Sequence, residues 1–179
     1  MAVNVERIVF ASHCILNQAT RAWGGTGDAS RERGMISEVI EVLSRHGVGI
    51  VQIGCPEFSL HGNPRPARDK GGYDKEEFRG RCMEIASEAV EHMVEMQEKG
   101  RDPRIRVVAV LGVEGSPSCG VERTPGAADE HGHLIDALKE EMARSGLEIP
   151  VLDVSLREGE RRMRLERLED LLRETDPLN

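Results

Sequence analysis

The 179-residue sequence contains no long hydrophobic run and no N-terminal targeting segment. No stretch approaches the roughly 20 apolar residues that a membrane-spanning helix needs. The first residues, "MAVNVERIVFASHC", hold an apolar run that is too short for a signal peptide and no cleavage pattern. We therefore expect a cytoplasmic protein that has no membrane partner.

The sequence also lacks an excess of basic residues. Its formal net charge is −8, which disfavours nucleic acid as a partner because duplex and RNA binding usually needs a basic face. No repeat, low-complexity tract or linker interrupts the chain, and its length fits one domain over residues 1–179. The glycines of "GGTG" (24–27) do not form a dinucleotide fingerprint, which argues against NAD. The sequence leaves a homo-oligomer open.

Strand and helix patterns alternate along the chain. Short apolar runs rich in β-branched residues predict buried strands over residues 7–12, 48–54, 105–113 and 149–154. Helical periodicity predicts helices over residues 29–47, 74–100, 133–146 and about 156–174. This alternation predicts an α/β fold with a Rossmann-like open, mostly parallel sheet and helices on both faces. In such sheets, ligands bind beyond the carboxyl ends of the strands.

Three of the four cysteines follow predicted strands. Cys14 comes two residues after the first strand, Cys55 directly after the second, and Cys119 after the third and a short loop. Because parallel, adjacent strands end at the same edge, we expect these three thiols to meet there. Cys82 lies instead on the apolar stripe of a predicted helix, and we interpret it as a small buried hydrophobe.

Three converging thiols suit two kinds of metal site. In a cytoplasmic protein, cysteines indicate metal binding or catalysis rather than disulfides. A catalytic zinc takes three or four such ligands, and His13 beside Cys14 is an available imidazole. An iron–sulfur cluster held by three cysteines leaves one iron open. Soft thiolates fit both metals, so the spacing alone does not choose between them.

Short motifs are spread over residues 7–154 and read "SHCILN", "GCPEF", "HGNPRP", "GGYDKEEFRG" and "GSPSCG". The pairing of Cys-Pro-Glu with Ser-Pro-Ser-Cys-Gly at the ends of strands is a specific combination. Together the motifs resemble those of the TudS-like (2-thiouracil desulfidase-related) family, of which this chain looks like a side branch. The resemblance implies a Rossmann-like domain that holds a [4Fe–4S] cluster. Its three ligands would be Cys14, Cys55 and Cys119, with one iron left open.

The resemblance also implies a reaction, in which a small thiolated molecule such as a nucleobase loses its sulfur. The open iron would bind the thiocarbonyl sulfur, and water would hydrolyse the C–S bond without net redox. Glu57 matches the glutamate of the family motif and lies two residues from Cys55, where a carboxyl group is placed to move protons. Ser116 or Ser118 matches the motif serine.

Three further residues are candidates for substrate binding. Arg65 lies between two prolines and is predicted to contact an anionic or carbonyl group. Trp23 is predicted to stack on a planar base. His13 is predicted to act as a hydrogen-bond donor or ligand beside the metal.

The chain departs from the family pattern where "FSLHGNPRP" replaces the usual Gly-Gly after Cys-Pro-Glu, so the resemblance transfers the cluster better than the substrate. Sulfur delivery from the cluster to an acceptor would use the same parts in reverse. Two other functions fit the same cysteines. One is a zinc-dependent hydrolase, and the other is a non-enzymatic iron–sulfur carrier or redox sensor.

Overall fold

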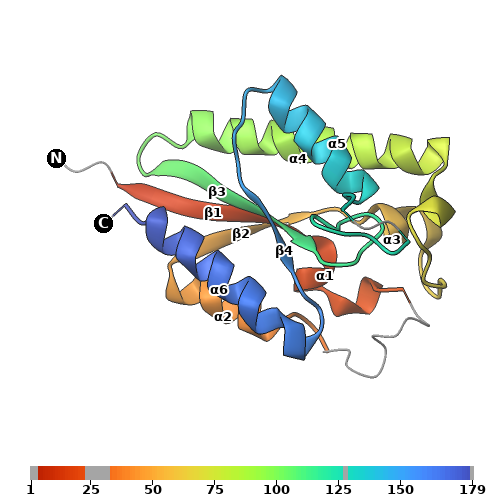
Figure 1. The fold of residues 1–179 in the computed structure, drawn as a ribbon. Helices are drawn as coiled ribbons and strands as arrows, with labels where there is room; N and C mark the ends of the chain where they lie inside the picture. Colours follow the sequence, from red (N-terminus) through yellow and green to blue (C-terminus); the bar gives the residue numbers. More distant parts are fainter. Residues whose placement is uncertain (1–3, 23–32, 127–128, 178–179) are drawn as a thin grey trace.

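The computed structural model describes residues 4–22, 33–126 and 129–177. In this part of the chain, four parallel strands form one open sheet in the order β2-β1-β3-β4 (Figure 1). The strands are β1 (Val5–Ser12), β2 (Val48–Ile53), β3 (Arg104–Val113) and β4 (Val151–Val154). The prediction of an open, parallel α/β sheet is confirmed.

The two central strands carry the apolar core. β1 pairs in parallel with both β2 and β3, so its backbone hydrogen bonds are satisfied on both edges. Val9 in β1 and Val110 in β3 are fully buried, since helices cover both faces of a parallel sheet. The edge strands β2 and β4 have mixed burial along their length. This difference explains why the central strands read as continuous apolar runs.

Helices cover both faces of the sheet, as the sequence predicts. In Figure 1, α4 (Glu76–Lys99) and α5 (His133–Arg144) lie on one face, and α2 (Ser37–Arg45) and α6 (Glu158–Glu174) lie on the other. Short helical turns follow the strands: α1 (His13–Leu16), η1 (Gln18–Thr20), α3 (Pro56–His61) and η3 (Gly71–Tyr73). Among the described residues, no helix is both long and apolar enough to cross a membrane.

The helix predicted over residues 29–47 is wrong at its start, because α2 begins only at Ser37. Gly34 has a left-handed φ of +82°, and its carbonyl accepts a hydrogen bond of 2.7 Å from the Gln18 N–H. This bond ties the segment before α2 to the turn after β1. Met35 lies in this segment before the helix and is 48% exposed. The first residues of the predicted helix lie outside the described part of the chain.

Two glycines of the α4 region predict opposite effects on stability. At Gly100, which caps the helix, an added Cβ would lie 2.6 Å from the Ile105 side chain and 2.7 Å from the Met96 carbonyl oxygen. Gly100→Ala is therefore expected to lower the free energy of unfolding by about 1–3 kcal/mol. Gly80 lies exposed within α4 with nothing near its Cβ position. Gly80→Ala is expected to raise the free energy of unfolding by roughly 0.5–1 kcal/mol, because alanine favours the helix.

Urea denaturation of both variants and the native protein measures this pair. Two variants that are both more stable than the native protein would contradict the close packing of the Gly100 backbone on Ile105.

Candidate metal and active site

A cavity of about 590 Å³ opens at the carboxyl edge of the sheet. Each strand contributes a segment to its wall: Cys14 follows β1, Cys55 follows β2, Cys119 follows β3, and Leu156 follows β4. From β1 the chain continues to β2 at one edge of the sheet, and from β3 it continues to β4 at the other edge. The cavity therefore lies at the topological switch point, where open α/β sheets bind their ligands.

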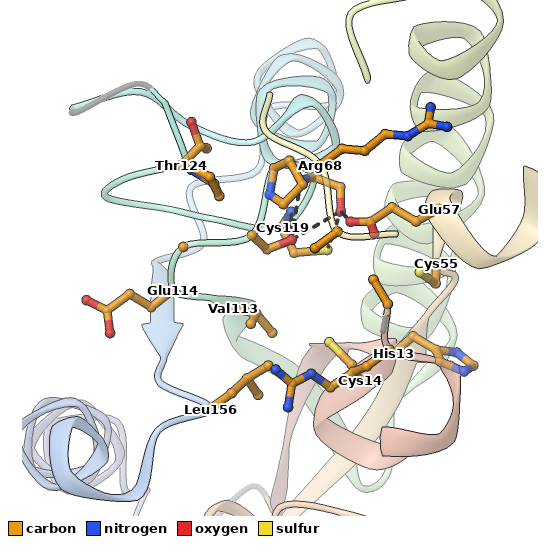
Figure 2. A pocket seen from close by; sticks show the side chains of 18 of the residues that line it. His13, Cys14, Cys55, Glu57, Arg68, Val113, Glu114, Cys119, Thr124 and Leu156 are labelled. Atoms are coloured by element: carbon orange, nitrogen blue, oxygen red, sulfur yellow. Dashed lines mark hydrogen bonds between the residues drawn. The ribbon is translucent and has the colours of Figure 1, made fainter. Parts of the chain in front are cut away.

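The thiols of Cys14, Cys55 and Cys119 surround one open space within this cavity (Figure 2). Cys14 and Cys55 are partly buried, and Cys119 is buried. None of the three forms a disulfide. The three thiols that the sequence predicts to meet at one edge do line one cavity. That they bind a metal stays a prediction.

Each of the three cysteines is held in a turn just beyond its strand. Cys55 is the residue before the first turn of α3, and its sulfur accepts a hydrogen bond of 3.4 Å from the Phe58 N–H. Cys14 lies in the single turn of α1. The N–H of Cys119 donates to the Ser116 hydroxyl at 3.0 Å. Because turns rather than long loops carry them, the thiols have defined positions.

Burial keeps these thiols protonated in the metal-free protein. Burial raises the pKa of Cys14 well above its usual value, and the neighbouring Cys119 and Cys55 raise it further. Burial, with help from Cys55, raises the pKa of Cys119 to about 12. The pKa of Cys55 is also raised, first by burial and then by Glu57. The cysteines are thus poor nucleophiles by themselves, and metal binding would have to displace their protons.

The arrangement of the side chains has different consequences for a single zinc ion and for an iron–sulfur cluster. Among the described residues, no group of three or more His, Cys, Asp or Glu side chains is arranged to hold a metal ion. A [4Fe–4S] cluster is larger than one ion, and each cysteine binds a different iron of it. The three free thiols around an open space are soft donors of the kind that such clusters use, and a cluster at this place stays a prediction.

Glu57 is buried beside the cysteines and receives three hydrogen-bond donors. The Ser118 hydroxyl donates to Oε1 at 2.6 Å, and the Tyr73 hydroxyl donates to Oε2 at 3.3 Å. The Arg65 guanidinium forms an ion pair with Oε2 at 3.4 Å. A buried carboxylate is stable only with such partners, so these contacts fix the orientation of Glu57 and balance its charge.

The structure gives the two candidate serines different surroundings. Ser118 is buried, and its hydroxyl lies between Glu57 and the Cys119 sulfur, 3.6 Å from the latter. The Ser116 hydroxyl accepts hydrogen bonds from the N–H groups of Ser118 and Cys119, as serines do in tight turns. Ser118 therefore contacts the candidate catalytic carboxylate directly, whereas Ser116 shapes the turn. A catalytic role for either serine stays a prediction.

The three predicted substrate-binding residues have different positions. Arg65 lines the cavity but is buried, and its Nη1 donates to the Gly62 carbonyl oxygen and to Asn63. Its Nε is buried and meets no acceptor among the described residues. Arg65 thus orients Glu57, and its predicted contact with a substrate stays a prediction. Trp23 lies outside the described residues.

His13 lines the cavity, but its imidazole points away from the Cys14 thiol in Figure 2. The ring stacks on Phe58 at 6.4 Å between centroids, and burial lowers its pKa, which favours the neutral form. Its Nε2 is buried and makes no hydrogen bond with any described residue. The predicted roles of His13, as a donor or ligand, stay predictions.

Sequence reasoning missed Tyr73, the single tyrosine of the chain. Its ring is buried and stacks on Phe78 at 4.6 Å, and the Arg68 guanidinium lies 5.5 Å from its centroid. Burial and the nearby Glu57 raise the pKa of Tyr73 to about 12, so its hydroxyl remains a donor. The available signal was its place in "GGYDKEEFRG", where the only tyrosine of the sequence follows two glycines.

Fold and site together define a Rossmann-like α/β protein with a cavity lined by three thiols and a buried carboxylate. No family model matches the chain, and no solved structure matches it. The chain is similar to the uncharacterized protein MJ0003 of Methanocaldococcus jannaschii. The two are 29% identical over 121 residues, which cover 68% of this chain and 72% of that protein. The name of this relative states no activity, so the likeness transfers no function.

Proposed function

We propose that this protein is a [4Fe–4S]-dependent, non-redox desulfidase that removes sulfur from the thiocarbonyl group of a small molecule. A thiolated nucleobase is the substrate class that we favour. One observation carries the proposal: thiols from three strand ends line the same cavity as a buried, hydrogen-bonded glutamate. The resemblance of the cysteine motifs to the TudS-like desulfidases supports the same assignment.

Cys14, Cys55 and Cys119 would hold three of the four irons. When bound, the cluster supplies an iron that no protein side chain occupies, a Lewis acid suited to a soft sulfur ligand. The three cysteines come from the ends of different strands, so the sheet sets their relative positions.

The net reaction replaces sulfur by oxygen: R₂C=S and H₂O give R₂C=O and H₂S, with no electrons transferred. Glu57 takes a proton from the attacking water, since its buried carboxylate is oriented by Tyr73, Arg65 and Ser118. Arg65 places a positive charge 3.4 Å from Oε2 of this carboxylate. The Ser118 hydroxyl lies between this carboxylate and Cys119, and links the base to the metal side of the cavity.

The cavity suits a small molecule with carbonyl oxygens. Its volume, about 590 Å³, lies within the range of roughly 300–1,000 Å³ that is usual for small-molecule sites. Its charged lining consists of Glu57, Glu114, Glu160, Arg21, Arg65, Arg68, Arg123 and Arg157. Arginines thus outnumber carboxylates there, although the whole chain carries a formal charge of −8. Guanidinium groups are good partners for carbonyl and anionic oxygens.

The two alternative functions account for less of the site. A mononuclear zinc hydrolase requires ligands grouped around one ion, and the described residues provide no such group. An iron–sulfur carrier or sensor requires neither a cavity of substrate size nor a buried carboxylate with three donors.

Anaerobic reconstitution with iron and sulfide, followed by incubation with 2-thiouracil and 4-thiouracil, tests the proposal. We expect a broad absorption shoulder in the blue and release of sulfide together with uracil. A colourless protein that binds one zinc per chain would indicate the hydrolase. A brown protein that releases no sulfide from either compound would indicate the carrier or sensor.

A further inference from the structure

The turn that carries Cys119 is held by backbone hydrogen bonds to the end of β3 and to the start of α5. The Cys119 carbonyl oxygen accepts a hydrogen bond of 2.8 Å from the N–H of Val113, at the end of β3. The Gly120 carbonyl oxygen accepts one of 2.8 Å from the N–H of Gly132, which precedes α5. The turn is thus attached to the sheet on one side and to a helix on the other.

Asp153, in the edge strand β4, binds the same turn directly after Cys119. Its side chain is buried, and its two carboxylate oxygens each accept one backbone hydrogen bond of 2.8 Å, from Val121 and from Glu122. Gly112 is the register partner of Asp153 in β3. A Cβ at Gly112 would lie 2.4 Å from the Cys119 carbonyl oxygen, so only glycine lets the turn pack this closely.

The start of α5 contacts the turn from the other side. The Leu134 N–H donates to the Ser118 carbonyl oxygen at 2.9 Å. A Cβ on Gly132 would lie 2.3 Å from the Ser118 carbonyl carbon and 2.8 Å from the Cys119 nitrogen. The helix start and the turn therefore pack backbone against backbone, with no space for a side chain.

We infer that Asp153 is a positioning residue that holds the Cys119 thiol in the cavity, facing Cys14 and Cys55. The importance of this position rests on the proposed function, in which Cys119 binds the cluster. Without the carboxylate, the N–H groups of Val121 and Glu122 lose their acceptors, and Val121 is buried. An unsatisfied buried N–H is costly, so the turn moves toward water and takes Cys119 with it.

Asp153→Asn tests this inference with little change of shape. The amide nitrogen replaces one carboxylate oxygen and places a donor against a backbone N–H. The measurement is the iodoacetamide labelling rate of each cysteine in the cluster-free protein, followed by peptide mass spectrometry. We expect the labelling rate of Cys119 to rise about tenfold, because hydrogen bonds to a charged acceptor are among the stronger ones. The buried Cys82, in α4, is expected to keep its native labelling rate.

Glu166→Gln is the matched control, since it removes an exposed carboxylate of α6 that pairs with Arg162. Its labelling pattern is expected to match that of the native protein. An unchanged Cys119 rate in Asp153→Asn would overturn the inference. An equal rise at all four cysteines would also overturn it, because that pattern reports general unfolding.

Gly132→Ala is the second variant, and it displaces the turn from the helix side. If Asp153→Asn does not fold, Gly132→Ala tests whether the contacts of the turn hold Cys119 in place. A selective rise of the Cys119 labelling rate supports the inference, and an unchanged rate overturns it. Iron content after reconstitution separates this inference from the proposed function. If the native protein binds iron and Asp153→Asn binds less, the result supports both the positioning role and the proposed cluster. If the native protein binds no iron but Cys119 labelling is still selectively raised in Asp153→Asn, the result overturns the cluster and supports the positioning role.

Discussion

Glu57→Gln is expected to retain the cluster and to lower the desulfidase rate by about 10²–10⁴-fold, the usual contribution of a general acid or base. Glutamine has nearly the same shape but takes up no proton from water at neutral pH. Glu57 is two residues from Cys55 but is not a ligand in our assignment, so the absorption spectrum should persist. The measurement is sulfide release per cluster, with iron content determined on the same sample.

Glu114→Gln is the matched control for this substitution. Glu114 is a second glutamate of the same cavity, with a side chain that is 8% exposed, and it pairs with Arg164 and Arg123 as Glu57 pairs with Arg65. Both variants lose a carboxylate beside a guanidinium and are expected to lose stability, but only Glu57→Gln removes the proposed base. Full activity in Glu57→Gln with an intact spectrum would remove Glu57 from the mechanism. Equal losses in both variants would reduce Glu57 to a structural role.

Substitution of Cys14, Cys55 or Cys119 by serine is expected to lower bound iron and to abolish desulfuration. Each change replaces a soft thiolate by a hydroxyl, which binds iron poorly. All three thiols line the cavity, so each is expected to matter in the same way. The measurement is iron and acid-labile sulfide per chain after anaerobic reconstitution, together with sulfide release from thiouracil.

Cys82→Ala is the control for the cysteine series. Cys82 is buried in α4, and its pKa is raised first by burial and then by Cys119, so it lies close to the site without lining the cavity. We expect full iron content and a loss of stability on the order of 1 kcal/mol. Loss of the cluster in Cys82→Ala with retention in Cys14→Ser would show that our ligand assignment is wrong. Loss in all four variants would indicate a four-cysteine cluster without an open iron, and so favour electron transfer or sensing.

The apolar patterns of the sequence predicted the sheet and the edge at which the cysteines lie. Each strand is recognisable from a short apolar run of the sequence. A parallel sheet then brings the carboxyl ends of its strands to one edge, independently of the exact helix bounds. The burial of Cys82 followed from the helical spacing of its apolar neighbours. The start of α2 did not follow from periodicity, because it depends on the hydrogen bond between Gln18 and Gly34, two residues on different segments.

The residues that support the candidate site are brought together by long-range contacts that the sequence pattern does not reveal. Tyr73 and Arg65 reach Glu57 because the segment between α3 and α4 folds back over the strand ends. Asp153 reaches the turn after Cys119 because β4 lies beside β3 in the sheet. No periodicity or motif spacing in the sequence indicates the contacts to Glu57 or the contact of Asp153 with the turn. A single buried hydrogen bond depends on where two distant backbones meet, whereas an apolar pattern averages over many side chains of one element and is therefore readable locally.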